Sequence, residues 1–454
     1  MSGTEMRTLH GWGRTAPSRA HVLAPRTVDE VAAAVLAAGP RGVIARGLGR
    51  SYGDPAQNAG GTVLDMTGLA AIHEIDAGNA RVVVDAGVSL DTLMRAALPH
   101  GLWLPVLPGT RQVTIGGAIG ADIHGKAHHV VGSFGNHVES LDLVTADGAV
   151  RTLTPDGEDA ELFWATVAGM GLTGVVTRAT LRLHRVETAY FTVDTEQIDN
   201  LDELMARQSV DDERYAESVS WFDAVTTGKH FGRGLLMRAN HATLAELPPK
   251  LRADPLKFDA PQLLTVPDVF PPGLLNRLTG KLFSELWYRK SPTRFGAIQN
   301  ITQFLHPLDV IGEWNRGYGP RGFLQYQFVV PLERDDVIRT VLERMTAAGQ
   351  VSALNVLKRF GEGNRAPLSF PRPGWTLCVD IPINPGAGPL CDELDEIVLD
   401  AGGRHYLAKE SRTTPAAIRR GYPRLDEWRK VRDAVDPHNV FASDMSRRLE
   451  LTRD

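Results

Sequence analysis

The sequence Arg46-Gly47-Leu48-Gly49-Arg50-Ser51-Tyr52-Gly53-Asp54 is the most informative stretch of this 454-residue chain. A short buried strand is predicted just before it, over Gly42 to Ala45, and the residues after it are turn formers rather than helix formers. A nicotinamide dinucleotide fingerprint needs a helix here and a glycine in place of Tyr52, so that fingerprint does not fit. A loop rich in Gly and Ser can instead turn successive N–H groups inward and bind an anion.

A second stretch of small residues follows, Pro108-Gly109-Thr110-Arg111-Gln112-Val113-Thr114-Ile115-Gly116-Gly117-Ala118. The chain from Thr114 to Ala121 would let a flat cofactor lie against the backbone, and Thr110 and Thr114 add hydroxyl donors. Together the two stretches indicate a bound dinucleotide, and their details favour a flavin. The alternative is that both are ordinary tight turns, because glycine alone is weak evidence.

The pattern R-G-x-G-x-S followed by P-G-T-x-x-x-T-x-G-G resembles the flavin-binding half of the vanillyl-alcohol-oxidase (PCMH-type) superfamily. The resemblance implies a two-domain α+β fold in which the two stretches clasp the FAD pyrophosphate. Many members join a His after the Ser covalently to the flavin, and here that position is Tyr52, so we expect non-covalent FAD. The expected cofactor contacts are Arg46, Gly47, Leu48, Gly49, Arg50, Ser51, Tyr52, Gly109, Thr110, Thr114, Gly116, Gly117, Ala118, Asp122, His124, Gly125, Val176 and Tyr406.

The composition is that of an ordinary globular protein, with 43% hydrophobic and 23% charged residues. A formal charge of −5 argues against non-specific nucleic-acid binding. The two cysteines, Cys378 and Cys391, are too few for a disulfide framework or a cysteine-rich metal site. We expect no signal peptide in Met1 to Ser18 and no transmembrane segment.

Hydrophobic periodicity changes along the chain and predicts three parts. Short strands alternate with helices up to about Glu187, which predicts an FAD-binding domain over 1–187. Four segments with two-residue alternation follow, Ser218 to Asp223, Phe323 to Val330, Ser352 to Phe360, and Trp375 to Ile381, the last expected to stop before Pro382. They predict an antiparallel sheet covered by helices in a substrate domain over 188–403, and helices over 404–454 return to the FAD-binding domain.

Strand alternation places several polar side chains on one face of this sheet. Gln325 and Gln327 share a face, as do Thr376, Cys378 and Asp380, and Lys358 lies on the face of Val356 and Phe360. Such a face would suit a floor above a flavin that contacts sugar hydroxyls. The alternative is a face that simply meets water, as one side of an antiparallel sheet often does.

Lys409 and His124 are the candidate proton-handling residues. A partly desolvated lysine near a flavin has its neutral form favoured, so Lys409 could accept a hydroxyl proton; the alternative is a surface lysine paired with Glu410. His124, His128 and His129 suggest a metal site, but no cysteine or carboxylate pair completes it, so we expect no metal. His124 is better interpreted as a donor beside the flavin or the substrate.

A closer resemblance extends over nearly the whole chain. The segments Gly11 to Ser18, Asp122 to Lys126, Leu256 to Leu264, Phe323 to Phe328 and Ala442 to Met445 are similar to the decaprenylphosphoryl-β-D-ribose 2′-oxidase family. This resemblance implies FAD-dependent oxidation of the ribose 2′-hydroxyl to a ketone. A separate NAD(P)H-dependent keto-reductase partner would then complete epimerisation to the arabinose lipid used for cell-wall arabinan.

The family comparison also suggests roles for individual residues. Lys409 matches an essential lysine, and Lys409, His124 and Tyr52 are the catalytic candidates. The substrate-binding candidates are Lys126, Trp221, Gln325, Gln327, Lys358 and Cys378, the last in the place of a cysteine trapped by nitroaromatic inhibitors. Thr376 and Leu305 depart from the asparagine and tyrosine expected there, which puts fine geometry in doubt.

Leu274, Leu278, Leu282 and Leu286 recur every four residues among basic residues. They predict an amphipathic helix that lies on a membrane or lines a prenyl groove, or else packs in a core. The family resemblance implies a prenylphosphoryl sugar lipid as substrate. Together with the amphipathic stretch it predicts a peripheral position at the plasma membrane, without indicating the cytoplasmic or the periplasmic face. The alternatives are an FAD-dependent oxidase of a soluble sugar, aldonolactone or polyol, and a flavin-binding scaffold without activity.

Overall fold

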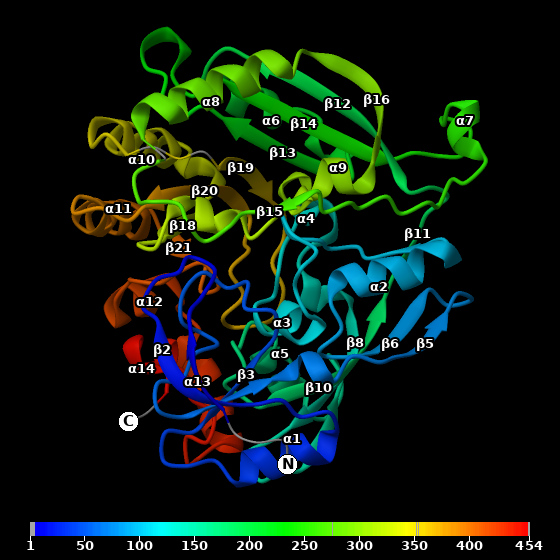
Figure 1. Ribbon diagram of the computed structural model, residues 1–454, viewed down its shortest axis with the longest axis vertical. Coiled ribbons are helices and arrows are strands. Elements are labelled where there is room, and N and C mark those ends of the chain that lie inside the picture. Colours follow the sequence, from blue (N-terminus) through cyan, green and yellow to red (C-terminus); the bar gives the residue numbers. More distant parts are fainter. Residues whose placement is uncertain (1–4, 275, 351, 353, 453–454) are drawn as a thin grey trace.

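The computed structural model describes residues 5–274, 276–350, 352 and 354–452. Figure 1 shows an upper half of the molecule with one large sheet and a lower half with two smaller sheets. This mixture of helices and antiparallel sheets confirms the predicted α+β class.

The lower half holds two sheets. The first has the order β1-β2-β4-β3, formed by Glu5–Leu9, Ser18–Leu23, Thr62–Asp65 and Val43–Arg46. The second has the order β5-β6-β10-β8-β9, formed by Ile72–Asp76, Arg81–Asp85, Val175–Arg182, Val138–Val144 and Val150–Leu153. The N-terminal helices of this half include α1 (Val28–Leu36), α2 (Leu90–Ala97), α3 (Ile115–Gly120) and α5 (Ala160–Thr166). Helix α4 (His128–Val131) contacts β19 of the large sheet.

The upper half contains one antiparallel sheet of eight strands, in the order β16-β12-β14-β13-β19-β20-β18-β21. These strands are Arg294–Asn300, Tyr190–Ile198, Gly234–His241, Glu217–Phe222, Asn355–Phe360, Gly374–Pro382, Phe323–Val330 and Arg404–His405. One face packs its apolar side chains against α6 (Leu201–Gln208), α10 (Asp336–Ala347) and α11 (Ala387–Asp400). The other face carries the polar residues predicted from strand alternation.

The C-terminal helices lie in the lower half, where Figure 1 shows them in red beside the blue N-terminal strands. They are α12 (Pro415–Gly421), α13 (Leu425–Val435) and α14 (Asp444–Arg448). A parallel bridge joins Phe441 to Val43, and the indole N–H of Trp428 donates to the carbonyl of Ala165 over 2.9 Å. The chain therefore returns to the first sheets, while β21 at Arg404–His405 still pairs with β18. The exact domain boundaries stay a prediction.

Two strand predictions differ from the structure. Strand β20 extends through Pro382, which pairs with Phe323 at the end of the ladder, where a missing N–H is tolerated. The strand predicted over Ser352 to Phe360 begins later, at Asn355, as β19. A short β11 (His184–Arg185) after β10 pairs with β7 (Leu102–Trp103). In the described part of the chain, no helix has the length and apolar character needed to cross a membrane.

Candidate active site

The two glycine-rich stretches pack directly against each other. A Cβ built on Gly47 would lie 2.1 Å from Oγ1 of Thr114, so only glycine allows this approach. Thr114 is the N-cap of α3 and accepts from the N–H of Gly117. Gly49 has a φ of +67°, which a larger residue rarely adopts. The family resemblance predicts that the two stretches lie together, and the small size of Gly47 explains how they can approach so closely.

This cradle fits a pyrophosphate-containing cofactor. Within the described residues, the N–H groups of Leu48, Gly49 and Arg50 have no hydrogen-bond partner, and these residues are only half-buried. A Cβ on Gly109 would meet no atom within 4 Å, so open space lies against its backbone. Free N–H groups beside open space are what an anionic group requires.

Tyr52 and Lys409 meet where the glycine cradle reaches the large sheet. The N–H of Tyr52 donates to the carbonyl of Ala408 over 2.9 Å, which joins the two loops. Nζ of Lys409 lies 3.9 Å from the centre of the Tyr52 ring, a cation–π contact. The Tyr52 hydroxyl accepts from Nε2 of Gln325 over 2.9 Å.

His124 lies over the same strand, β18. Its Nε2 is 3.0 Å from the amide nitrogen of Gln327, so this ring nitrogen accepts while Gln327 donates. Its Nδ1 is buried and has no partner among the described residues. The imidazole packs among the rings of Phe360, Phe370 and Tyr406.

The polar face of the sheet is buried, so the alternative that it meets water is wrong. Gln325, Gln327 and Cys378 are 5%, 4% and 9% exposed. Gln325 also donates to Oδ1 of Asp380 over 2.7 Å, and the Tyr318 hydroxyl donates to Oδ2 over 3.0 Å.

Burial changes the protonation of the groups on this face. It lowers the pKa of Lys409 and of Lys358 to about 8, although the nearby Cys378 raises both in part. Burial also raises the pKa of Asp380 to about 7 and that of the Cys378 thiol to about 12. The site therefore combines lysines of near-neutral pKa with a neutral thiol.

Lys126 and Glu217 lie further along the same face. Burial lowers the pKa of Lys126 to about 8 and raises that of Glu217 to about 8, and each partly offsets the shift of the other. Nζ of Lys126 donates to the carbonyl of Phe304 and lies 4.3 Å from its ring centre. Trp221, on β13 opposite Val356 of β19, is also buried.

Several expected cofactor residues are used inside the protein. The Asp122 carboxylate accepts from Ser133, Ser369, Asn364 and the N–H of Gly135. The Arg46 guanidinium donates to the carbonyls of Ala56 and His10. The Arg50 guanidinium lies 4.3 Å from the centre of the Trp12 ring. The Tyr406 hydroxyl donates to the carbonyl of Ala121. Oγ1 of Thr110 accepts from the N–H of Gln112. The other expected contacts in these stretches, Ser51, Gly116, Ala118, Gly125 and Val176, lie on the loops, α3 and β10 as predicted from sequence.

The structure decides between the two interpretations of Lys409. Glu410 does not pair with Lys409, because its carboxylate binds Arg448 at 2.9 Å. Among the described residues, no group of three His, Cys, Asp or Glu side chains could hold a metal ion, and His128 instead packs against Phe360.

Sequence reasoning did not assign a role to Asp380, Tyr318 or Glu217. Asp380 shares a strand face with Cys378, so the alternation alone could have found it. Tyr318 lies in a short 3-10 helix and Glu217 at the start of β13, and no local pattern marked either.

Comparison with known proteins agrees with this geometry. A family model described as FAD binding domain matches residues 19–154, and one described as D-arabinono-1,4-lactone oxidase matches residues 324–449. Decaprenylphosphoryl-beta-D-ribose oxidase of Mycolicibacterium smegmatis is 58% identical over 459 residues, which cover 99% of this chain and 100% of that protein. An uncharacterized protein of Streptomyces coelicolor is 40% identical over 80% of this chain and 100% of its own. L-gulono-1,4-lactone dehydrogenase of Mycobacterium tuberculosis is 25% identical over 94% of this chain and 95% of its own.

These matches confirm FAD as the cofactor and an oxidoreductase activity that depends on it. Because the 58% identity extends over 99% of the sequence, the chain belongs to the decaprenylphosphoryl-β-D-ribose oxidase family.

Proposed function

We propose that this protein oxidises the ribose 2′-hydroxyl of decaprenylphosphoryl-β-D-ribose to the 2′-ketone. The observation that carries the proposal is the position of Lys409, whose Nζ lies over Tyr52 between the glycine cradle and the buried polar face of the sheet. The full-length similarity to a protein of that named activity supports the choice of substrate.

Non-covalent FAD would be held by the two glycine-rich stretches, with its phosphates at the free N–H groups of Leu48, Gly49 and Arg50. When bound, FAD supplies the acceptor for the hydride that leaves the sugar carbon. Tyr52 occupies the position of the covalently linked histidine found in other members of the superfamily. Its phenol instead accepts from Gln325, which orients the ring beneath Lys409.

Lys409 is the proposed proton acceptor. Because burial lowers its pKa to about 8, an appreciable fraction is neutral near neutral pH and can take the hydroxyl proton. His124, with Nε2 occupied by Gln327 and Nδ1 without a described partner, is proposed to hydrogen-bond the sugar. Tyr52 supports the lysine rather than titrating, since burial raises its pKa well above the usual value.

The substrate phosphate and sugar would meet the remaining polar groups. Lys358 and Lys126 supply positive charge, and a bound phosphate would favour their protonated forms. Gln327, Trp221 and Cys378 lie on the same face, where they would contact the sugar. The Cys378 thiol stays neutral because burial raises its pKa, so its proposed role is contact rather than nucleophilic attack.

A second candidate function is oxidation of a soluble aldonolactone. The match of residues 324–449 to the D-arabinono-1,4-lactone oxidase model favours it, since that segment includes Gln325, Gln327 and Lys409. The ribose oxidase relative nevertheless has the higher identity, 58% against 25% for the lactone dehydrogenase, and the match covers its full length.

An anaerobic absorbance titration tests both functions. The proposed function predicts that the flavin band bleaches with a prenylphosphoryl ribose and not with L-gulono-1,4-lactone or D-arabinono-1,4-lactone. Bleaching by a lactone alone would contradict it and support the second candidate. A flavin that no compound bleaches would leave the scaffold interpretation.

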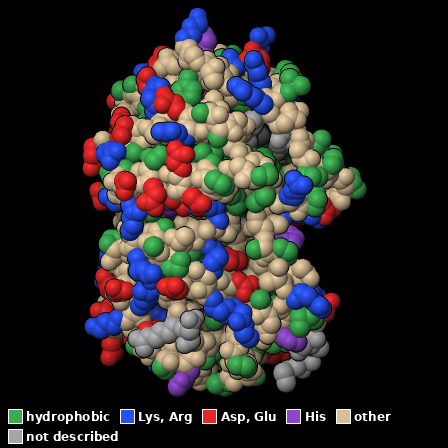
Figure 2. All heavy atoms as spheres, turned by 90° about the vertical axis from the view of Figure 1, so that its left-hand side faces the viewer, with side chains coloured by type: hydrophobic (Ala, Val, Ile, Leu, Met, Phe, Trp, Pro, Cys, Tyr) green, Lys and Arg blue, Asp and Glu red, His purple; other side chains and the backbone are tan. Residues whose placement is uncertain are grey.

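We also propose that the protein contacts a lipid bilayer through α8 (Arg277–Lys290) and the segment before it. Its large apolar side chains are exposed, with Leu278 at 78% and Leu282 at 60%, so the alternative of a core-packing helix does not hold for them. Other apolar residues exposed on α8 are Phe283, Leu286 and Trp287, and in the flanking segments Leu263, Leu264, Val269, Phe270, Leu274 and Phe295 are exposed. Figure 2 shows hydrophobic side chains among Lys and Arg on the upper half of one face.

Basic residues around α8 favour an anionic lipid surface as the partner. Leu278→Glu with Leu282→Glu should abolish flotation with vesicles of anionic phospholipid, whereas Leu36→Glu with Val210→Glu, at exposed positions elsewhere, should not. Unchanged flotation of the first variant would overturn the lipid contact. The lipid contact would give the protein a peripheral location at the plasma membrane.

A keto-reductase partner that uses NAD(P)H is the final part of the proposal. A ketone formed at C2′ must be reduced to reach the inverted alcohol, and the described residues offer no nicotinamide fingerprint. The purified protein alone should therefore accumulate the ketone, and arabinose lipid should form only after a reductase is added. Formation of the arabinose lipid by this chain alone would contradict the need for a partner.

A further inference from the structure

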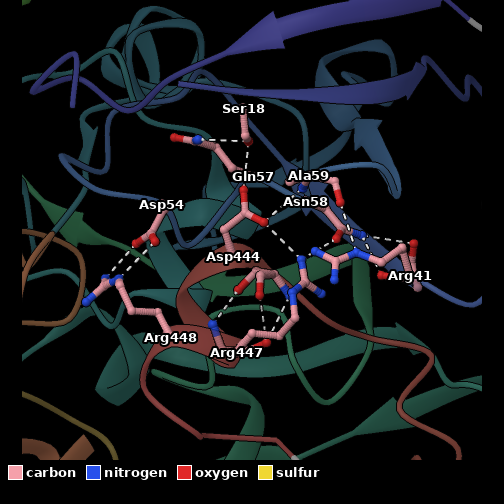
Figure 3. A network of polar contacts seen from close by, with 12 residues as sticks. Ser18, Arg41, Asp54, Gln57, Asn58, Ala59, Asp444, Arg447 and Arg448 are labelled. Atoms are coloured by element: carbon pink, nitrogen blue, oxygen red, sulfur yellow. Dashed lines mark hydrogen bonds and ion pairs between the residues drawn. The ribbon is translucent and has the colours of Figure 1, made fainter. Parts of the chain in front are cut away.

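The short C-terminal helix α14 joins the two loops that carry Tyr52 and Lys409. Arg448, its last residue, binds Asp54 through two hydrogen bonds, Nη2 to Oδ1 at 2.7 Å and Nε to Oδ2 at 3.0 Å. The same guanidinium donates to Oε2 of Glu410 over 2.9 Å. Asp54 follows Tyr52 by two positions and Glu410 directly follows Lys409. Figure 3 shows the Arg448–Asp54 pair within the wider network around α14.

Both carboxylates need this cation. The side chains of Asp54 and Glu410 are 8% and 4% exposed, so neither is well solvated. Glu410 also accepts from the N–H groups of Arg412 and Thr413, which fixes the turn after Lys409. Removal of the guanidinium would leave two buried negative charges facing each other, and such a pair separates or takes up protons.

The two loops are in backbone contact, so their separation would be felt at the site. The N–H of Tyr52 donates to Ala408, and a Cβ on Gly53 would lie 2.2 Å from the carbonyl oxygen of Glu410. The N–H of Lys409 donates to the carbonyl of Tyr406 over 2.9 Å. A shift of Glu410 therefore moves Lys409 relative to the Tyr52 ring.

We propose that Arg448 is a positioning residue for the oxidation: by holding Asp54 to Glu410, it keeps Nζ of Lys409 over Tyr52. This inference rests on the proposed function for the role of Lys409. Arg448 acts indirectly, through the backbones of the two loops that carry Tyr52 and Lys409.

The adjacent residue provides a matched control. Arg447 lies on the same helix and donates to Oδ1 of Asn58 over 2.7 Å and to Asp444 over 2.9 Å. Asp444 in turn accepts from Ser18 and from the N–H of Ala59. Loss of Arg447 therefore weakens the attachment of α14 to the N-terminal part and leaves the Asp54–Glu410 link in place.

The test compares Arg448→Met, Arg448→Lys and Arg447→Met in the FAD-loaded protein. Hydrogen–deuterium exchange at the Tyr52 and Lys409 amides reads the joint between the loops without any turnover. Anaerobic stopped-flow bleaching with a prenylphosphoryl ribose gives the rate constant of flavin reduction and the apparent substrate affinity.

Arg448→Met should speed exchange at both amides and lower the rate constant roughly 10- to 100-fold, while the substrate concentration for half-maximal rate changes little. Arg448→Lys, which retains the charge without the two-pronged bond, should fall between Arg448→Met and the wild type. Adding Glu410→Gln to Arg448→Met should recover part of the rate, because it removes the repulsion. Arg447→Met should speed exchange near Ala59 and leave flavin reduction unchanged.

Equal losses of rate in Arg448→Met and Arg447→Met would show general destabilisation and overturn the proposal. Unchanged exchange at Tyr52 and Lys409 in a folded Arg448→Met would also overturn it. If Arg448→Met does not fold, amide exchange and the rate of flavin reduction in Arg448→Lys test the proposal in its place. If Lys409→Met reduces its flavin at the normal rate, the proposed role of Lys409 fails, and the exchange data still decide whether Arg448 holds the loops.

Discussion

Nζ of Lys409 lies 3.9 Å from the centre of the Tyr52 ring, although the two residues come from opposite ends of the chain. Tyr52 lies in the first glycine-rich stretch, and Lys409 follows β21, the last strand of the large sheet along the chain. The contact places a lysine of lowered pKa at the edge of the flavin cradle, where a substrate hydroxyl would lose its proton.

Lys409→Met should lower the rate constant of flavin reduction about 10²- to 10⁴-fold, because a positioned general base contributes that much. FAD content should stay normal, since the side chain makes no part of the glycine cradle. The measurement is anaerobic stopped-flow bleaching. Lys430→Met, at an exposed position on α13, is the control and should match the wild type. Bleaching of Lys409→Met at the wild-type rate would exclude this lysine as the base.

The rate of flavin reduction should rise with pH and level off above a midpoint near pH 8. The reason is that the neutral amine accepts the proton, and burial lowers the pKa of Lys409 to about 8. Charged and titratable groups around it are Tyr52, His124, Lys358, Cys378, Asp380 and Glu410. Lys358 has a similar pKa, so Lys358→Met should weaken substrate binding and keep the rising profile. A profile without a rise between about pH 7 and pH 9 would argue against a titrating lysine base.

The contribution of Asp380 to the free energy of unfolding should fall as the pH rises from about 4 to about 7. Burial raises the pKa of its carboxyl from 3.8 to about 7, so the folded state keeps a proton that the unfolded chain releases. Below about pH 4 both states are protonated and the contribution is fully present. Urea unfolding at pH 5 and pH 7.5 should differ less in Asp380→Asn than in the wild type. Asp426→Asn, at a side chain 91% exposed, should leave that difference unchanged; an equal effect of both variants would contradict the assignment.

Gly109→Ala should weaken FAD binding without destabilising the fold. A Cβ there meets no protein atom within 4 Å, so any cost must come from the cofactor that approaches this backbone. Gly39→Ala, where a Cβ also meets nothing within 4 Å, is the matched control. FAD affinity is measured by quenching of flavin fluorescence and stability by thermal unfolding. Equal FAD affinity of the two variants would remove Gly109 from the proposed cofactor site.

Local sequence patterns predicted four of the eight strands of the large sheet, namely β13, β18, β19 and β20. Strand β18 matches the predicted bounds Phe323 to Val330. The two-residue alternation also identified which side chains share a face, because successive side chains of a strand point to opposite sides. What alternation could not decide was whether that face meets water. The structure buries it, since the glycine cradle and the 406–413 loop lie against it.

Tertiary contacts determined the partners of single residues. Lys409 and Glu410 are neighbours in sequence and an ion pair between them was plausible, yet Glu410 binds Arg448 on the opposite side of the loop. The Asp122 carboxylate, in an expected cofactor loop, joins that loop to Ser369 and Asn364. No local pattern carries such information, because each pairing depends on how distant segments are brought together.

Local sequence patterns and the family resemblance they carry were thus sufficient to predict the cofactor class and the family. Glycine positions and strand alternation are local constraints of backbone sterics, and they persist wherever the segment lies in the fold. The contact of Lys409 with Tyr52, the contact of His124 with Gln327 and the Arg448–Asp54 pair became visible only in the folded molecule. Burial sets the pKa of that lysine and of Asp380, and burial is a property of the packed molecule rather than of any stretch of the chain.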